Sequence, residues 1–74
     1  MLGTVIKNYI NDKGLIQSRI AEKANMPINT FNDILNERRK IETLEYFKIC
    51  SALGVNTEFF KEKLVEMNLI NLVS

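Results

Sequence analysis

The side chains best suited to specific hydrogen bonding occur together on one short stretch of the chain. Asn29 and Asn32 each carry a donor and an acceptor, and Thr30 and Asp33 lie beside them at helical spacing. An amide that donates and accepts together matches the major-groove edge of adenine, whereas a carboxylate either accepts from cytosine N4 or repels the duplex. Taken alone, the pattern favours a solvated polar helix face. Contact with base edges is the alternative, and it depends on the motif that surrounds these residues.

The residues on either side of this stretch offer contacts of other kinds. Ile28 precedes it and is predicted either to meet a thymine methyl group or to be an ordinary core residue. The run from Glu37 to Lys40 follows it and interrupts the apolar pattern, as a charged loop would. Its three cations would attract phosphates whatever the base sequence, and an arginine there could also enter a narrow minor groove. A merely soluble loop is the alternative.

Composition argues against most other chemistry. The 74 residues include no His and one Cys, so we expect no zinc finger, haem site or His-based triad, and no cofactor or metal. Cys50 alone cannot form an intramolecular disulfide, which fits a reducing, cytoplasmic location. We expect no membrane span, which needs about 20 apolar residues, and no signal peptide. Without a nucleophile–base pair, we also predict no enzymatic or catalytic activity.

The net charge of +1 conceals an uneven distribution. Residues 1–40 carry seven cations and four anions, which gives +3, whereas residues 41–74 carry three cations and five anions, which gives −2. A polyanion would therefore be attracted preferentially to one end of the molecule.

Length and periodicity predict a single small all-α domain over residues 1–74. A chain this short buries only about 60% of its unfolded surface, so a partner adds to its stability. Apolar residues recur at helical spacing nearly throughout, and no segment alternates as a strand does. We expect five helices, over about residues 2–12, 17–24, 27–36 and 43–53 and from about residue 57 onward.

Each of the first four expected helices has an apolar face. The residues predicted to be buried are Leu2, Ile6, Tyr9 and Ile10; Ile20, Ala21 and Ala24; Phe31, Ile34 and Leu35; and Leu44, Phe47, Cys50 and Leu53. Gly14 and Gly54 are natural helix ends, and Asn25 stands at a sharp turn, where Asn tolerates the left-handed conformation. Met26 would lie between the two helices that this turn joins, and Asn56 is a plausible N-cap for the last helix.

The most informative unit is the helix–turn–helix over about residues 17–36. Two short helices joined by a three-residue turn cross steeply, and the outer face of the second then forms a ridge that fits a DNA major groove. The segments 17–24, 25–36 and 47–60 resemble the Cro/C1-type (XRE-family) helix–turn–helix. The resemblance covers about residues 4–60 and is carried by Gln17 and Ala21 together with the later run from Ala52 to Val55.

The resemblance implies a lambda-repressor-like five-helix bundle that inserts its third helix into double-stranded DNA at a near-palindromic operator, usually as a homodimer. The base-contacting residues that it implies are Ile28, Asn29, Thr30, Asn32 and Asp33. The phosphate-contacting residues that it implies are Gln17, Asn36, Arg38, Arg39 and Lys40.

The chain departs from the family pattern at three positions. Asn25 replaces the usual turn Gly, and Pro27 replaces a cap before the third helix. Ile16 stands where a Ser, Thr or Asn cap commonly precedes the second helix, and the missing cap costs about 1 kcal/mol. The outward face of the third helix also lacks Arg and Lys, which gives little support to direct reading of guanine.

The tail over residues 59–74 is more apolar than one helix on a small bundle requires. Nine of the fifteen residues from Phe59 to Val73 are apolar. One helix cannot bury that many on a single face, so we predict a self-complementary dimer surface. A tail folded back over the core of the monomer is the alternative.

These features together predict a phage-like, sequence-specific DNA-binding regulator, with repression by occlusion of polymerase as the default mode. The competing prediction is a protein-interaction module on the same fold, such as an antitoxin that binds its toxin or an antirepressor. The near-neutral charge and the apolar tail favour this competitor somewhat.

Overall fold

The computed structural model describes the backbone of residues 1–73 and the side chains of residues 1–66. All regular structure in this described part is α-helical. In chain order the helices are α1 Leu2–Asp12, α2 Gln17–Lys23, α3 Ile28–Leu35, α4 Thr43–Leu53 and α5 Glu58–Val73. The predicted all-α, five-helix fold is therefore confirmed, and each helix lies close to its predicted bounds.

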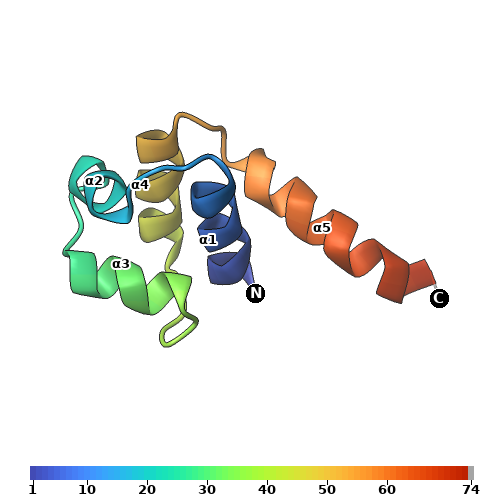
Figure 1. The fold of residues 1–74 in the computed structure, drawn as a ribbon. Helices are drawn as coiled ribbons and strands as arrows, with labels where there is room; N and C mark the ends of the chain where they lie inside the picture. The colour runs from blue at the N-terminus through green and yellow to red at the C-terminus, as the bar shows by residue number, and fades with distance from the viewer. Residues whose placement is uncertain (74) are drawn as a thin grey trace.

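Helices α1 to α4 form a bundle, and α5 projects away from it (Figure 1). α1 packs against α3 and α5, whereas α2 packs against α3 and α4. The molecule measures 40 × 23 × 22 Å along its principal axes, and α5 lies along the long direction. No helix in the described part of the chain is long and apolar enough to cross a membrane.

The core is formed by side chains from all five helices and from the connection between α2 and α3. Its buried members are Val5, Ile6, Ile10, Ile20, Ala21, Ala24, Met26, Phe31, Ile34, Leu35, Tyr46, Ile49, Cys50 and Phe60. Leu2 and Tyr9 pack against this core and are partly buried. The predicted inner faces of α1, α2 and α3 are therefore confirmed, as is the burial of Met26.

The predicted inner face of α4 is wrong at two of its four positions. Leu44 is 64% exposed and Phe47 is 48% exposed. Cys50 is buried and Leu53 is partly buried, as predicted. Burial raises the pKa of the Cys50 thiol, which behaves as a small core residue.

A rotation of α4 explains this difference. Its buried face runs through Tyr46, Ile49 and Cys50. The Tyr46 hydroxyl donates a hydrogen bond to the carbonyl oxygen of Thr57, just before α5, and this bond holds Tyr46 on the inner side. Burial raises the pKa of Tyr46 to about 12, so the hydroxyl keeps its proton and remains a donor. Leu44 and Phe47 consequently face solvent.

The predicted turn residues adopt the expected conformations. Gly14, Asn25 and Gly54 have φ values of 66°, 54° and 73°, in the left-handed region. Ile16 gives α2 no side-chain cap, as predicted. Asn56 Oδ1 accepts the first N–H of α5 at 3.1 Å and so acts as its cap. These local features set the helix ends and the turn between α2 and α3.

The contact between α1 and α3 requires a glycine. Gly3 is buried on α1, and a Cβ atom added there would lie 2.1 Å from the carbonyl oxygen of Ile34 in α3. The Gly3 Cα and the Ile34 carbonyl oxygen both belong to the backbone, so neither can move away without shifting a helix. The glycine therefore fixes how closely α3 approaches α1.

We expect Gly3→Ala to lower the free energy of unfolding by about 2 kcal/mol, because overpacking outweighs the helix preference of Ala. Urea unfolding followed by circular dichroism measures this change. The control is Asn8→Ala on the exposed side of α1, which should change the free energy by less than about 0.5 kcal/mol. An unfolding free energy for Gly3→Ala at or above that of the unaltered protein would contradict the close contact.

Candidate nucleic-acid interface

Helix α3 presents its predicted polar residues on the side opposite the core. Phe31, Ile34 and Leu35 are buried, so the other side of the helix faces outward. Asn29, Asn32, Asp33 and Asn36 follow the i, i+3, i+4, i+7 spacing of a single face. Asn29 and Asn36 are exposed, and Asn32 and Asp33 are half-buried. We call these four residues the α3 polar face.

Two predicted base-contacting residues flank the α3 polar face. Ile28, the first residue of α3, is 39% exposed, so it lies at the surface and outside the core. Thr30 is half-buried on the other flank. Gln17, a predicted phosphate contact, is half-buried and stands at the first position of α2. The structure thus brings the predicted base contacts onto one outward side of α3.

An ion pair places an arginine at the α3 polar face. Arg38 Nε lies 2.9 Å from Asp33 Oδ1; the Arg38 side chain is largely exposed and that of Asp33 is about half exposed. The carboxylate that would repel a duplex is therefore compensated by a cation from the loop that follows α3. Sequence reasoning assigned Arg38 to phosphate contact, with entry into a narrow minor groove as a further possibility for an arginine of this loop. It did not detect this pairing, which joins residues five apart across a helix end.

The next cation of the loop is also engaged. Arg39 Nη2 lies 2.8 Å from Glu45 Oε2 and 3.6 Å from Glu42 Oε1, both near the start of α4. Lys40 is exposed. Exposed ion pairs contribute about 0–1 kcal/mol, so phosphates can replace these carboxylates at small cost. A phosphate that bound Nη2 of Arg39 would therefore replace these carboxylates.

Asn36 is held by residues on both sides. Its Oδ1 accepts a hydrogen bond from Lys7 Nζ at 2.7 Å, and its Nδ2 donates to the carbonyl oxygen of Asn32 at 2.8 Å. The bond from Lys7 brings a cation from α1 to the α3 polar face. Sequence reasoning missed Lys7 because nothing in its local pattern distinguishes it from a solvated lysine.

Glu37 anchors the loop after α3 onto the start of α1. Glu37 has a φ of 61°, which is unusual for a residue other than Gly. At the same helix end, the Arg38 N–H donates a hydrogen bond to the Asp33 carbonyl oxygen at 2.8 Å. Glu37 Oε2 accepts hydrogen bonds from the N–H and the hydroxyl of Thr4 at 2.8 and 2.9 Å and pairs with the ammonium group of Met1. Glu37 was predicted only as part of a charged loop.

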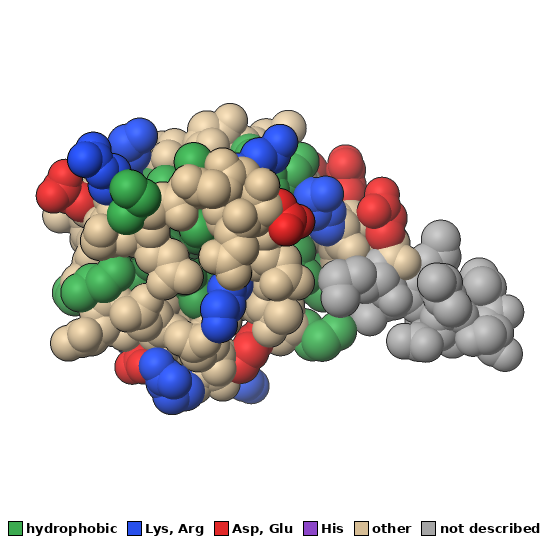
Figure 2. All heavy atoms as spheres, viewed as in Figure 1, with side chains coloured by type: hydrophobic (Ala, Val, Ile, Leu, Met, Phe, Trp, Pro, Cys, Tyr) green, Lys and Arg blue, Asp and Glu red, His purple; other side chains and the backbone are tan. Residues whose placement is uncertain are grey.

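Positive side chains border the α3 surface on two sides. Figure 2 shows Lys and Arg side chains over α2 and over the loop that follows α3. Most of the surface between these two groups is uncharged. No group of three or more potential metal ligands occurs among the described residues. The arrangement suits a polyanion that lies across α3.

The base of α5 is packed, whereas its later part leaves the bundle. Tyr9 meets the rings of Phe59 and Phe60 edge to face, with centroids 5.1 and 5.4 Å apart. Val65 is 57% exposed. Of the tail predicted to form a dimer surface, residues 67–74 lie outside the described side chains.

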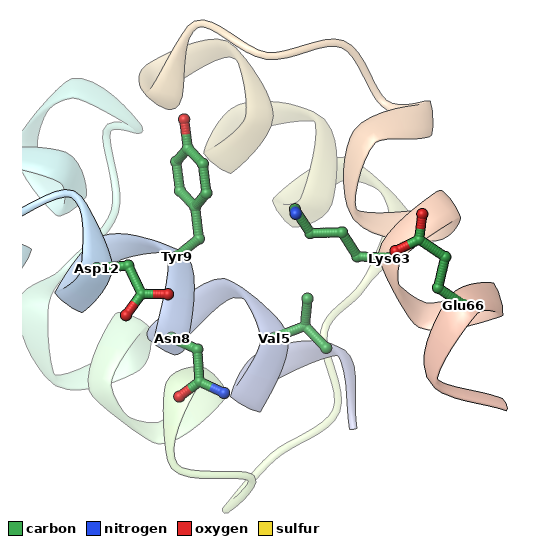
Figure 3. A pocket seen from close by; sticks show the side chains of 6 residues that line it. All are labelled: Val5, Asn8, Tyr9, Asp12, Lys63 and Glu66. Carbon is green, nitrogen blue, oxygen red and sulfur yellow. The ribbon is translucent and has the colours of Figure 1, made fainter. Parts of the chain in front are cut away.

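A hollow of about 250 Å³ opens between α1 and α5. Figure 3 shows the six residues that line it, with Lys63 reaching from α5 toward α1: Val5, Asn8, Tyr9, Asp12, Lys63 and Glu66. Its walls are partly apolar, and it lies beside the exposed part of α5.

No protein-family model, curated protein or solved structure matches this chain. The geometry of α3 and its surroundings therefore carries the functional interpretation.

We expect Glu37→Gln to lower the free energy of unfolding by about 0.5 kcal/mol at about pH 7, because it removes the charge that caps α1. Hydrogen bonds from the terminal ammonium and from the Thr4 N–H lower the pKa of Glu37 below its ordinary value of 4.5. Its stabilisation is therefore complete above that value and is lost as the pH falls through the lower folded pKa.

Urea unfolding across acid pH tests this prediction. The difference between the unaltered protein and Glu37→Gln should narrow as the pH drops below about 4. Glu22→Gln, at an exposed position of α2, is the control and should cost clearly less than Glu37→Gln at about pH 7. A constant Glu37→Gln difference down to acid pH would show that the carboxylate's charge does not stabilise the fold.

Proposed function

We propose that this chain is a sequence-specific DNA-binding regulator of the Cro/C1 type that places α3 in the major groove of an operator. The observation that carries the proposal is the α3 polar face, which is open to solvent while the opposite side of the helix is buried. The major groove of B-DNA is about 12 Å wide and admits one helix presented in this way. Repression by occlusion of polymerase is the proposed mode of regulation.

Amides carry the proposed base readout. Asn29 and Asn32 would each donate to and accept from adenine, and Ile28 would pack against a thymine methyl group. Asn36 orients the Lys7 ammonium beside them. This set favours A·T pairs, because the outward side of α3 itself carries no Arg or Lys.

Asp33 and Arg38 would act as one unit. Only Nε of Arg38 is bound to Asp33, so its terminal nitrogens can donate to a phosphate or a base edge. The carboxylate thereby orients the guanidinium instead of repelling the duplex. Gln17, Arg39, Lys40 and Lys7 would supply further phosphate contacts around this unit.

A homodimer would place two α3 helices in successive major grooves about 34 Å apart. Support for this arrangement comes from α5, which extends away from the bundle (Figure 1) and exposes Val65 at a hollow lined by residues of α5. A partner α5 related by a twofold axis would cover this exposed surface of α5.

Selection from a randomised DNA library tests the proposal. We expect enrichment of inverted half-sites spaced by about 10 base pairs. If each subunit neutralises about three phosphates, the logarithm of affinity should fall with the logarithm of salt with a slope near −5. Arg38→Ala combined with Arg39→Ala should weaken binding to every sequence and flatten this slope. No enrichment, or a slope near zero, would contradict DNA binding.

Asn32→Ala tests base readout separately. The variant should lose the preference at one base position of each half-site, worth about 1–3 kcal/mol, while affinity for random DNA stays the same. Asn11→Ala, at an exposed position of α1, is the matched control and should leave the selected sequence unchanged. An unaltered base profile for Asn32→Ala would remove this residue from the readout set.

A protein-interaction module on the same fold is the second candidate function. The exposed Leu44 and Phe47 of α4 favour it, because neither side chain serves the core or the α3 polar face.

A further inference from the structure

The outer side of α4 exposes large apolar side chains that the fold does not require. Leu44 is 64% exposed and Phe47 is 48% exposed. Leu44, Phe47, Lys48 and Ser51 follow the i, i+3, i+4, i+7 spacing of one helix face, and all four are exposed. We call these four residues the α4 stripe. Exposed apolar side chains aligned along a helix mark an interaction surface when they border a hollow.

Such hollows lie on both sides of Phe47. One, of about 320 Å³, is lined by Lys23, Ala24, Asn25, Phe47, Lys48 and Ser51. The other, of about 220 Å³, includes the apolar side chains of Leu2, Ile41 and Tyr46 together with Glu42, Thr43 and Lys61. The Phe47 ring therefore separates two depressions, each of a size that accepts an apolar side chain.

The Phe47 ring is supported from within the fold. Its centroid lies 6.4 Å from that of Tyr46, which is buried and hydrogen-bonded to the Thr57 carbonyl oxygen. An aromatic side chain has two χ angles, so a partner that covers it orders few rotatable bonds.

The charges around the larger hollow have one sign. Lys23 from α2 and Lys48 from α4 line it, and none of the residues that line it carries a carboxylate. An occupant that brought apolar side chains and carboxylates together would satisfy both features of the site.

We propose that the α4 stripe and Lys23 bind an acidic amphipathic helix of another protein. Apolar side chains one turn apart on that helix would enter the two depressions beside Phe47, and its carboxylates would pair with Lys23 and Lys48. Helix-in-groove recognition uses this spacing of apolar anchors.

Two occupants from the same chain fit less well. Residues 67–74 contain no Asp or Glu, so they offer Lys23 and Lys48 no side-chain carboxylate. A second copy that placed its own α4 stripe there by twofold symmetry would set lysines against lysines. A separate acidic partner avoids both conflicts.

NMR titration of the full chain tests the proposal with a synthetic helical peptide of about 14 residues, or about 21 Å. The probe carries Leu and Phe at helical spacing on one face and Glu on both flanks. The matched peptide has Lys in place of Glu. We expect chemical-shift changes confined to residues around Lys23, Phe47 and Lys48, and at least tenfold tighter binding of the acidic peptide, about 1.4 kcal/mol.

Two variants and one control define the site. Phe47→Ser should weaken binding of the acidic peptide at least tenfold, or about 1.4 kcal/mol, and Lys23→Glu with Lys48→Glu should reverse the preference between the peptides. Val65→Ser removes an exposed apolar side chain from α5 and should leave binding unchanged. All these positions are exposed, so the variants should keep the circular dichroism of the unaltered protein.

Three outcomes would overturn the proposal. The first is that the two peptides bind equally or not at all. The second is that the chemical-shift changes centre on residues away from Phe47. The third is that the chain self-associates, and that Phe47→Ser abolishes this self-association whereas Val65→Ser does not. The last would assign the stripe to a second copy. Because the stripe shares no residue with the α3 polar face, these outcomes are independent of the DNA selection.

Discussion

The orientation of α3 depends on one close contact between two backbones. The Ile34 carbonyl oxygen lies where a side chain of Gly3 would begin, so α1 and α3 approach as closely as backbones allow. Glu37 joins the same two elements a few residues later through Thr4. The outward direction of the α3 polar face follows from these contacts. Since they involve none of its side chains, the residues of that face can change without altering the fold.

Internal pairing of charges governs what the α3 surface can bind. Asp33 holds Arg38, and Glu45 holds Arg39, so the cations near α3 are oriented and partly neutralised. A polyanion gains less from such cations than from solvated lysines, because neighbouring carboxylates offset part of their charge. In the proposed DNA complex, non-specific attraction would then be weak, and a larger share of the affinity would come from amides such as Asn29. This balance favours discrimination between sequences over tight binding to any sequence.

Local signals made most of the fold predictable from sequence. The features that could not be predicted depend on contacts between residues far apart in the chain. Gly14 and Asn25 act within a few residues of themselves, so their turns could be predicted. The rotation of α4 could not, because apolar residues at helical spacing occur on two of its faces and both faces include Cys50. The site shows the same limit. Its helix face follows from periodicity, whereas the bond from Lys7 to Asn36 spans 29 residues.

The two proposed surfaces are connected through one turn of the chain. Asn25, which holds the left-handed turn between α2 and α3, also lines the hollow beside Phe47. α2 packs against α4 on one side and against α3 on another. An occupant of the α4 stripe would therefore touch the turn that sets the angle of α3 without covering the α3 polar face. Such an occupant could bind together with DNA, and any effect it had on DNA affinity would have to act through the crossing angle of α2 and α3.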